Sequence, residues 1–169
     1  KLREIAVVYP PDTTWIVIGD HGMTDVVEEV DVSALARRHA TEVGAVEGRD
    51  YLVFLDSTMA RFLWKTETGR KMEGRLRDDA QMKVKGRFID KALAQEHAIP
   101  VGDRRYGDLL GWANLGVLIF PDYFHDLHTH NKGMHGYASD EHNMKGFFLA
   151  FGPGIAPRTI DEVNLIDVC

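Results

Sequence analysis

The fold of this chain is decided by the stretch Trp15-Ile16-Val17-Ile18-Gly19-Asp20-His21-Gly22-Met23. Its first four residues form a continuous apolar run, which is typical of a strand buried on both faces, as in a parallel sheet covered by helices. A second run of this kind, GFFLAF over residues 146–151, precedes Gly152-Pro153-Gly154. Two core-type strands near the two ends of the chain, with a mixed stretch between them, predict an α/β sheet that carries a large insertion.

The residues between these two runs predict the contents of the insertion. Residues 31–40 begin with a helix N-cap residue and have apolar residues at helical spacing. The charged stretch 70–96 favours two helices, interrupted at Gly74 and Gly86. Strands are expected at 51–55, 59–64, 108–113 and 116–120, a polar histidine-rich loop at 121–141, and the start of another element at 161–168. We therefore expect residues 1–169 to form a single domain with an inserted α+β region over residues 25–132.

Composition narrows the classes of partner. Twenty basic and twenty-six acidic residues among 169 give a net charge of −6, which argues against a surface that coats a nucleic-acid duplex. An anionic small molecule remains compatible with this charge, because bound metal ions can supply the positive charge that the chain lacks. A single cysteine, Cys169, excludes an internal disulfide and any cysteine-rich zinc module. The sequence contains neither a membrane-spanning apolar run nor a signal peptide.

Asp20 and His21 directly follow the first predicted strand, where ligands bind in sheets of this class. A carboxylate beside a neutral imidazole offers one oxygen and one nitrogen to a divalent ion, a mixture that zinc accepts. Gly19 and Gly22 permit a sharp turn and leave space for an ion and a substrate oxygen. The alternative interpretation is a surface loop in which Asp20 caps a helix and His21 is simply exposed, because so short a motif is weakly specific.

A second candidate is Gly133-Met134-His135-Gly136-Tyr137, in the loop before the second strand. The neighbouring histidines make this region rich in imidazole; they are His125, His128, His130 and His142. The spacing His125-x-x-His128-x-His130 is compatible with an independent metal cluster or with a solvated loop. We favour the loop, because neither a cysteine nor a reliable carboxylate partner completes the set.

Taken together, these motifs resemble the type I phosphodiesterase/nucleotide pyrophosphatase family of the alkaline phosphatase superfamily. The resemblance rests on the stretch 15–23, on His135-Gly136-Tyr137 and on the stretch 144–154, MKGFFLAFGPG, all in the family's order. Residues 106–121 also resemble the strand pair that precedes the histidine motif in that family. The resemblance implies an alkaline-phosphatase-like mixed or parallel sheet with flanking helices and an inserted α+β subdomain, truncated at both ends.

The resemblance also implies a reaction and its metal ligands. In that family two zinc ions about 4 Å apart support phosphoryl transfer. By similarity, Asp20 and His21 bind one zinc and His135 binds the other. A threonine or serine nucleophile attacks phosphorus in that family, and water then releases the phosphoryl group. The expected substrate is a phosphate-ester small molecule such as a nucleotide. Family members are often extracellular or periplasmic, and the sequence itself assigns no compartment.

The sequence departs from the family's pattern before Gly19. The family's other ligands and its nucleophile precede the Asp-His-Gly-Met motif, whereas the eighteen residues before Gly19 contain no histidine. We therefore expect the C-terminal portion of a longer two-metal hydrolase of phosphodiester or pyrophosphate bonds, inactive as the isolated chain. Two alternatives remain. One is a non-catalytic α/β module for binding or assembly. The other is a related hydrolase acting on phosphomonoesters, phosphonates or sulfate esters.

The insertion offers further candidate side chains. Five could reach a phosphate or stack on a base: Arg61, Trp64, Arg104, Arg105 and Tyr106. We favour a solvated surface with one packed tryptophan for this set. A helical-spacing apolar set is more typical of a core face than of a ligand site: Met72, Leu76, Met82, Phe88 and Leu93. For Tyr137, orientation of His135 and simple packing are equally compatible with the sequence.

Overall fold

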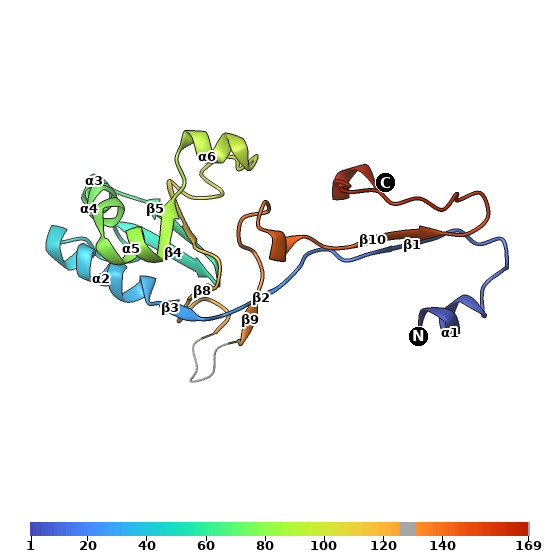
Figure 1. The fold of residues 1–169 in the computed structure, drawn as a ribbon. Helices are drawn as coiled ribbons and strands as arrows, with labels where there is room; N and C mark the ends of the chain where they lie inside the picture. Colours follow the sequence, from blue (N-terminus) through green and yellow to red (C-terminus); the bar gives the residue numbers. More distant parts are fainter. Residues whose placement is uncertain (126–130, 169) are drawn as a thin grey trace. The chain divides into compact units, whose positions relative to one another are not determined.

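The computed structural model describes residues 1–125 and 131–168, which divide into two compact units. Unit 1 combines residues 1–22 with the C-terminal residues from Lys145 onward, and unit 2 comprises residues 23–144. The insertion expected at 25–132 lies within unit 2. Figure 1 shows the elements of both units. Within the described ranges, no helix is long and apolar enough to cross a membrane.

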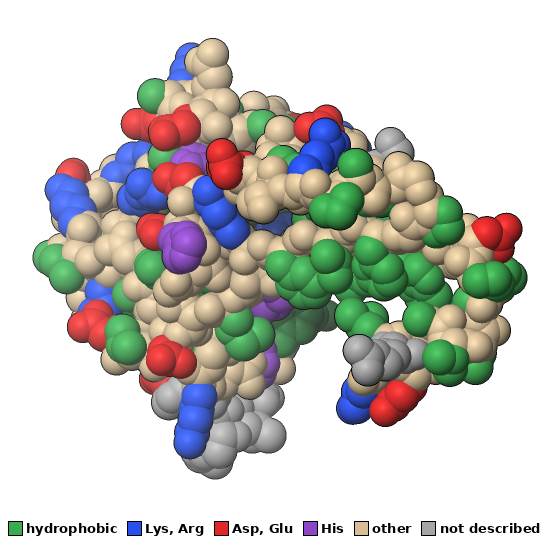
Figure 2. Space-filling model, turned by 45° about the vertical axis from the view of Figure 1, so that its right-hand side comes forward, with side chains coloured by type: hydrophobic (Ala, Val, Ile, Leu, Met, Phe, Trp, Pro, Cys, Tyr) green, Lys and Arg blue, Asp and Glu red, His purple; other side chains and the backbone are tan. Residues whose placement is uncertain are grey.

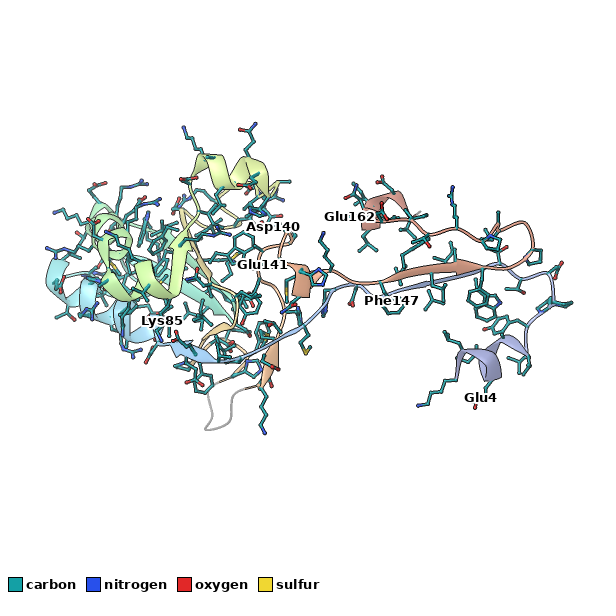
Figure 3. All side chains as sticks on the ribbon, in the orientation of Figure 1. Glu4, Lys85, Asp140, Glu141, Phe147 and Glu162 are labelled. Carbon is teal, nitrogen blue, oxygen red and sulfur yellow. The ribbon has the colours of Figure 1, made fainter. Side chains whose placement is uncertain are left out.

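Unit 1 is built on a ribbon of two antiparallel strands. Strand β1 (Trp15–Ile18) pairs with β10 (Phe148–Phe151), so that Trp15 lies opposite Phe151 and Ile18 opposite Phe148. The two apolar runs near the ends of the sequence both form strands, as expected, and the two strands pair with each other. A short helix, α1 (Leu2–Ala6), precedes the ribbon, and a 3-10 turn, η2 (Leu165–Asp167), follows it. An ion pair of 3.0 Å between Lys145 and Glu162 ties the segment before β10 to the C-terminal segment (Figure 3).

The burial expected for these strands is wrong. Ile16 is 53% exposed and Leu149 is 44% exposed, and the pairing is antiparallel rather than parallel. The physical reason is that the ribbon has two strands, and in the described residues no helix of unit 1 packs over both of its faces. Figure 2 shows hydrophobic side chains gathered on the surface of the molecule.

Unit 2 contains an antiparallel sheet of four strands in the order β4-β5-β7-β6. Its strands are β4 (Tyr51–Asp56), β5 (Met59–Trp64), β6 (Gly86–Phe88) and β7 (Leu109–Ala113). A parallel pair joins β3 (Glu28–Val30) to β8 (Val117–Ile119), and an antiparallel pair joins β2 (Thr24–Asp25) to β9 (Gly133–Met134). The four strands that the sequence predicted in this region are confirmed, and β2, β3, β6 and β9 are additional.

Side chains alternate across the four-stranded sheet and feed two apolar clusters. On β7, Leu109 and Ala113 belong to the larger cluster, whereas Leu110 and Trp112 belong to the smaller one. The larger cluster also takes residues from helices α2 (Val32–Val43), α4 (Met72–Asp78) and α5 (Ala80–Lys85). Met72, Leu76 and Met82, predicted to form a core face, are all buried there. The smaller cluster takes Ala94 of α6 (Lys91–Glu96).

In place of the two helices expected over residues 70–96, the structure has three short helices and a strand. Helix α3 (Glu67–Arg70) precedes α4, α5, β6 and α6. Gly74 lies inside α4, whereas Asp79 separates α4 from α5 with an extended backbone and accepts from the N–H groups of Gln81 and Met82. Gly86 is the first residue of β6. A Cβ at this position would lie 2.6 Å from the carbonyl oxygen of Trp112, so the close approach of the two strands favours glycine here. Lys85 then binds β3, with its Nζ 3.0 Å from Glu28 Oε2 (Figure 3).

Candidate functional site

Asp20 and His21 lie in the loop that follows β1, within unit 1. The loop is held to the ribbon by the N–H of Gly19, which donates to the carbonyl oxygen of Phe147 at 2.8 Å. A Cβ at Gly19 would lie 2.9 Å from the Phe147 ring, so a glycine fits here with least disturbance. The Asp20 Oδ1 atom accepts from the N–H of His21 at 3.0 Å. The local backbone thus holds the carboxylate beside the imidazole.

The hydrogen bonds of His21 determine which of its ring nitrogens can bind a metal. Its Nδ1 lies 2.8 Å from the carbonyl oxygen of Gly22. A carbonyl only accepts, so Nδ1 carries the proton and Nε2 carries the lone pair of the neutral ring. This is the arrangement that orients metal-binding histidines, in which the other ring nitrogen donates to a backbone carbonyl or a carboxylate.

The donor atoms of this pair have a spacing that suits one ion. His21 Nε2 lies 3.5 Å from Asp20 Oδ2, and the two side chains are 38% and 80% exposed. Two ligand atoms at about 2.0–2.2 Å from a tetrahedral zinc ion are about 3.4 Å apart, so the observed spacing matches one edge of such a site. The spacing of the two donor atoms therefore fits a divalent ion. Among the residues that the structure describes, no group of three or more His, Cys, Asp or Glu side chains is placed to hold a metal.

His135 is an exposed side chain between two anchored neighbours in unit 2. Before it, Met134 is buried and pairs with Thr24 in the β2–β9 ladder. After it, the carbonyl oxygen of Gly136 accepts from Thr58 Oγ1 at 2.9 Å and from Trp112 Nε1 at 3.1 Å. Gly136 has a φ of +90°, and a Cβ there would lie 2.8 Å from Thr58 Oγ1. Both the backbone conformation and the lack of space therefore favour glycine at this position.

Tyr137 is buried, and its hydroxyl donates to the carbonyl oxygen of Val117 at 3.1 Å. Burial raises the pKa of Tyr137 to about 12. The hydroxyl has one proton and gives it to β8, so Tyr137 holds the backbone next to His135 rather than donating to the imidazole. Of the two interpretations open in the sequence, the contacts favour packing.

The two predicted motifs lie in different units, with Asp20 and His21 in unit 1 and His135 in unit 2. Within unit 2, Thr24 pairs with Met134 and Asp25 with Gly133. Thr24, the residue after Met23, therefore lies opposite Met134, the residue before His135. A further hydrogen bond of 3.2 Å runs from Asn143 Nδ2 to Thr24 Oγ1. A common site for Asp20, His21 and His135 stays a prediction.

The other histidines of the histidine-rich loop differ in their hydrogen bonds and exposure. His125 has its Nδ1 3.0 Å from Oδ1 of Asp122, whose carboxylate is buried and also accepts from Ser57 Oγ at 2.7 Å. This places His125 in a hydrogen-bonded loop. His142 is exposed in the 3-10 turn η1 (His142–Met144). The other two members of the candidate cluster, His128 and His130, lie outside the described residues.

Most of the side chains that the sequence suggested for phosphate or base contact are packed against or paired with other residues of the chain. Trp64 is buried in the larger core cluster. The three arginines have carboxylate neighbours: Arg61 with Asp56 at 3.3 Å, Arg104 with Asp108 at 3.7 Å, and Arg105 with Asp103 at 2.6 Å. Tyr106 is 41% exposed. The set therefore consists of three arginines paired with carboxylates, one exposed tyrosine and one packed tryptophan.

Sequence reasoning missed the anchors of His135. Thr58 lies in the turn between β4 and β5 and Trp112 lies on β7, 78 and 24 residues away from Gly136 along the chain. Neither has a local pattern that points to the histidine loop. The one available signal was Gly136 directly after His135, since a glycine is favoured where the backbone takes a positive φ.

Comparison with known proteins identifies the fold. No protein-family model matches the chain, and no curated protein sequence matches it. Solved structures of murine ectonucleotide pyrophosphatase/phosphodiesterase 5 match with a TM-score of 0.60 and 22% identity, both for the protein itself and for an inactive form in complex with AMP. The human protein of the same name matches with a TM-score of 0.60 and 19% identity.

These matches cover 83% of this chain and 34% of each of those chains, so the chain spans about a third of the length of the structures it resembles. At 19–22% sequence identity, these structural matches show a similarity of fold. The predicted mixed α/β fold class is confirmed, and the fold is similar to that of these structures over 83% of this chain.

Proposed function

We propose that this chain is part of a two-metal hydrolase of phosphodiester or pyrophosphate bonds, with a nucleotide-type substrate. The observation that carries the proposal is the donor geometry of Asp20 and His21, in which a carboxylate oxygen and an imidazole nitrogen lie 3.5 Å apart. The likeness in fold to the ectonucleotide pyrophosphatase/phosphodiesterase structures supports it, and one of those structures is a complex with AMP.

In this proposal Asp20 and His21 hold one zinc ion and His135 holds the second. Zinc bound there would act as a Lewis acid on the phosphoryl oxygens and would lower the pKa of an attacking hydroxyl or water. The chain's own contribution is orientation. The Gly22 carbonyl fixes the ring of His21, and the anchored carbonyl of Gly136 fixes the backbone beside His135.

Two ligands at one ion and one at the other are fewer than the three protein ligands of a catalytic zinc site. We therefore propose that the remaining ligands and the nucleophile come from polypeptide outside this sequence. The isolated 169-residue chain should then bind zinc weakly and hydrolyse phosphodiesters at no more than a trace rate. A substrate of another class, such as a phosphomonoester or a sulfate ester, would use the same metal chemistry. Hydrolysis assays with model substrates of each class distinguish these possibilities.

The test is metal titration of the chain with Co²⁺, whose visible absorption reports ligand type and geometry. Asp20→Ala and His21→Ala should each weaken the first binding event by about tenfold or more, the loss expected for one ligand of a small site. His135→Ala should leave that event intact and remove a separate one.

The matched controls are Asp12→Ala and His142→Ala, because both wild-type side chains are exposed and lie outside the motifs. Equal affinity in the three ligand variants and the controls would overturn the assignment of ligands. Hydrolysis of bis-p-nitrophenyl phosphate by the zinc-loaded isolated chain would overturn the need for further residues. With the longer protein, preference for p-nitrophenyl phosphate or p-nitrophenyl sulfate would overturn the proposed substrate class.

A further inference from the structure

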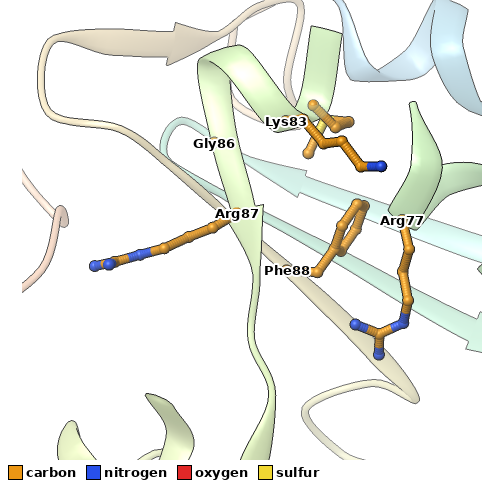
Figure 4. A pocket seen from close by; sticks show the side chains of 6 residues that line it. Arg77, Lys83, Gly86, Arg87 and Phe88 are labelled. Carbon is orange, nitrogen blue, oxygen red and sulfur yellow. The ribbon is translucent and has the colours of Figure 1, made fainter. Parts of the chain in front are cut away.

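A cavity of about 320 Å³ opens on unit 2 where α4, α5 and β6 meet (Figure 4). Six residues line it: Arg77, Met82, Lys83, Gly86, Arg87 and Phe88. Its size falls at the lower end of the range typical of small-molecule sites, about 300–1,000 Å³. None of the predicted metal ligands lines it, so it is separate from the proposed zinc chemistry.

The floor of this cavity is apolar and is built by the register of the sheet. Phe88 on β6 lies opposite Gly111 on β7. A Cβ at Gly111 would lie 3.2 Å from the Phe88 ring and 3.3 Å from the methyl group of Met82. Because the glycine has no side chain, the ring and the thioether rest together on the backbone of β7. The result is a flat apolar surface at the base of the cavity.

Two cations stand beside this floor. Figure 4 shows the side chains of Lys83 and Arg77 on either side of the Phe88 ring. The guanidinium carbon of Arg77 lies 5.8 Å from the ring centroid, a cation–π distance. Arg87, by contrast, extends away from Phe88, as expected for successive residues of a strand, and lies over Trp112 at 5.6 Å.

The existing partners of these cations leave donors available. Arg77 uses Nε and Nη2 on a single oxygen of Glu73, at 3.1 and 3.0 Å, which leaves Nη1 for another acceptor. Lys83 donates to Asp78 at 3.0 Å, in a pair whose side chains are 59% and 81% exposed. An ion pair so exposed is worth little and can exchange its partner.

The surrounding sequence adds charge of the same sign. Residues 70–87 contain seven basic and three acidic residues, a net charge of +4, in a chain whose net charge is −6. The cavity therefore lies on a positively charged stretch of an acidic protein. Such a local excess of positive charge favours anionic ligands.

We propose that this cavity binds a small organic anion with a flat apolar body. The body would rest on Phe88 and Met82, and the anionic group would lie between Lys83 and Arg77. The shared chemistry is one anionic group on an aromatic or similarly flat body, whether the anion is a phosphate or a carboxylate.

The test is titration of the 169-residue chain, followed by NMR, with phenylphosphonate as a non-hydrolysable probe. Saturable shifts should appear at Phe88 and its neighbours, and methylphosphonate, which has no ring, should bind about tenfold more weakly, as should the variant Phe88→Leu. Benzoate tests the carboxylate form of the same ligand. Lys83→Gln removes an exposed ammonium without disturbing the core, and it should weaken phenylphosphonate by about tenfold, the loss expected for one charge-assisted hydrogen bond.

Two further variants make the outcome decisive. Asp78→Asn frees Lys83 from its carboxylate and should strengthen binding by about two- to fivefold. Lys71→Gln removes an exposed cation of the same basic stretch that does not line the cavity, and it should change affinity by less than about twofold. The absence of saturable binding to the wild-type chain would overturn the proposal. An equal loss in Lys71→Gln and Lys83→Gln would also overturn it, because binding would then follow general charge. Repeating the titration with Asp20→Ala separates this site from the proposed metal site.

Discussion

The Nε2 atom of His39 on α2 lies 2.8 Å from Oδ2 of Asp79, a bond that joins segments 40 residues apart in sequence. An ionised carboxylate only accepts, so the imidazole donates. Arg38 donates to the same Asp79 oxygen. The other oxygen of Asp79 accepts from the backbone N–H groups of Gln81 and Met82, and so caps α5. One buried carboxylate therefore ends α4, starts α5 and ties both helices to α2.

Replacing Asp79 with Ala removes this whole set of interactions. Burial acts to raise the pKa of Asp79, but the bond from His39, the two backbone donors and the charge of Arg38 together hold that pKa below its ordinary value. We expect Asp79→Ala to lower the free energy of unfolding by about 2–4 kcal/mol, from the lost cap and the donors left buried. Urea unfolding followed by circular dichroism measures this.

The sign of the pH dependence follows from the depressed pKa. A carboxylate of this kind stabilises the fold above its unfolded pKa, near 3.8, and the contribution is lost as pH falls through the folded pKa. The difference between wild type and Asp79→Ala should therefore be largest at neutral pH and should shrink below about pH 4. Asp78→Ala is the adjacent control, since its exposed pair with Lys83 should be worth less than about 0.5 kcal/mol. Equal losses in both variants would contradict this account.

Asp50 is a second carboxylate whose titration should be visible in the stability of unit 2. Hydrogen bonds from Arg49, from the N–H of Val46 and from Thr66 lower the pKa of Asp50 to about 2. Its stabilising contribution is therefore present above pH 3.8 and is lost as the pH falls through about 2. Asp50→Asn should lower the urea midpoint at pH 7, and the deficit should persist to about pH 4 before it narrows.

The control for Asp50 is Asp103, whose pKa is lowered chiefly by the side chain of Arg105 two residues away. That pair is local to one loop, so Asp103→Asn should barely move the midpoint at any pH. A deficit of Asp50→Asn that stayed constant down to pH 2 would show that the side chain acts by packing rather than by charge.

Two glycines in neighbouring helices should respond oppositely to alanine. At Gly69 in α3 a Cβ would overlap the carbonyl oxygen of Asp50, whereas at Gly74 in α4 nothing lies within 4 Å of a Cβ. Gly69→Ala should destabilise unit 2 by about 1–3 kcal/mol through overpacking against backbone. Gly74→Ala should stabilise it by about 0.5–1 kcal/mol, because alanine restricts the unfolded chain and favours helix. Thermal unfolding of the two variants gives the comparison, and a shift of both in one direction would contradict it.

Local patterns identified most elements of unit 2 because their causes are local. Asp31 accepts from the N–H of Ala34 and caps α2, as its position before the apolar periodicity predicts. The division at Asp79 escaped sequence reasoning because its partner His39 belongs to another helix. The burial of Trp15–Ile18 was also misjudged, since an apolar run indicates a strand but does not determine what covers it.

The sequence names the candidate ligands individually, and their role as ligands stays a prediction, but it does not name the groups that support them. Asp20 and His21 are neighbours in sequence, so their pairing is visible without a fold, whereas the Gly22 carbonyl that fixes the ring is a matter of backbone direction. For His135, the supporting groups Thr58 and Trp112 are brought in by the four-stranded sheet and its turns. Only tertiary structure reveals such partners.

Tyr137 provides the last test, because it separates support of the fold from support of the proposed metal site. Its hydroxyl donates to Val117 on β8, so Tyr137→Phe should cost about 1 kcal/mol of unfolding free energy, the worth of one hydrogen bond. Since the ring remains and the proton does not go to His135, Co²⁺ binding should be unchanged. Tyr106→Phe is the control, because that side chain is 41% exposed and should alter neither property. If Tyr137→Phe instead weakened metal binding while stability stayed constant, Tyr137 would be a positioning residue for His135 and the packing interpretation would be wrong.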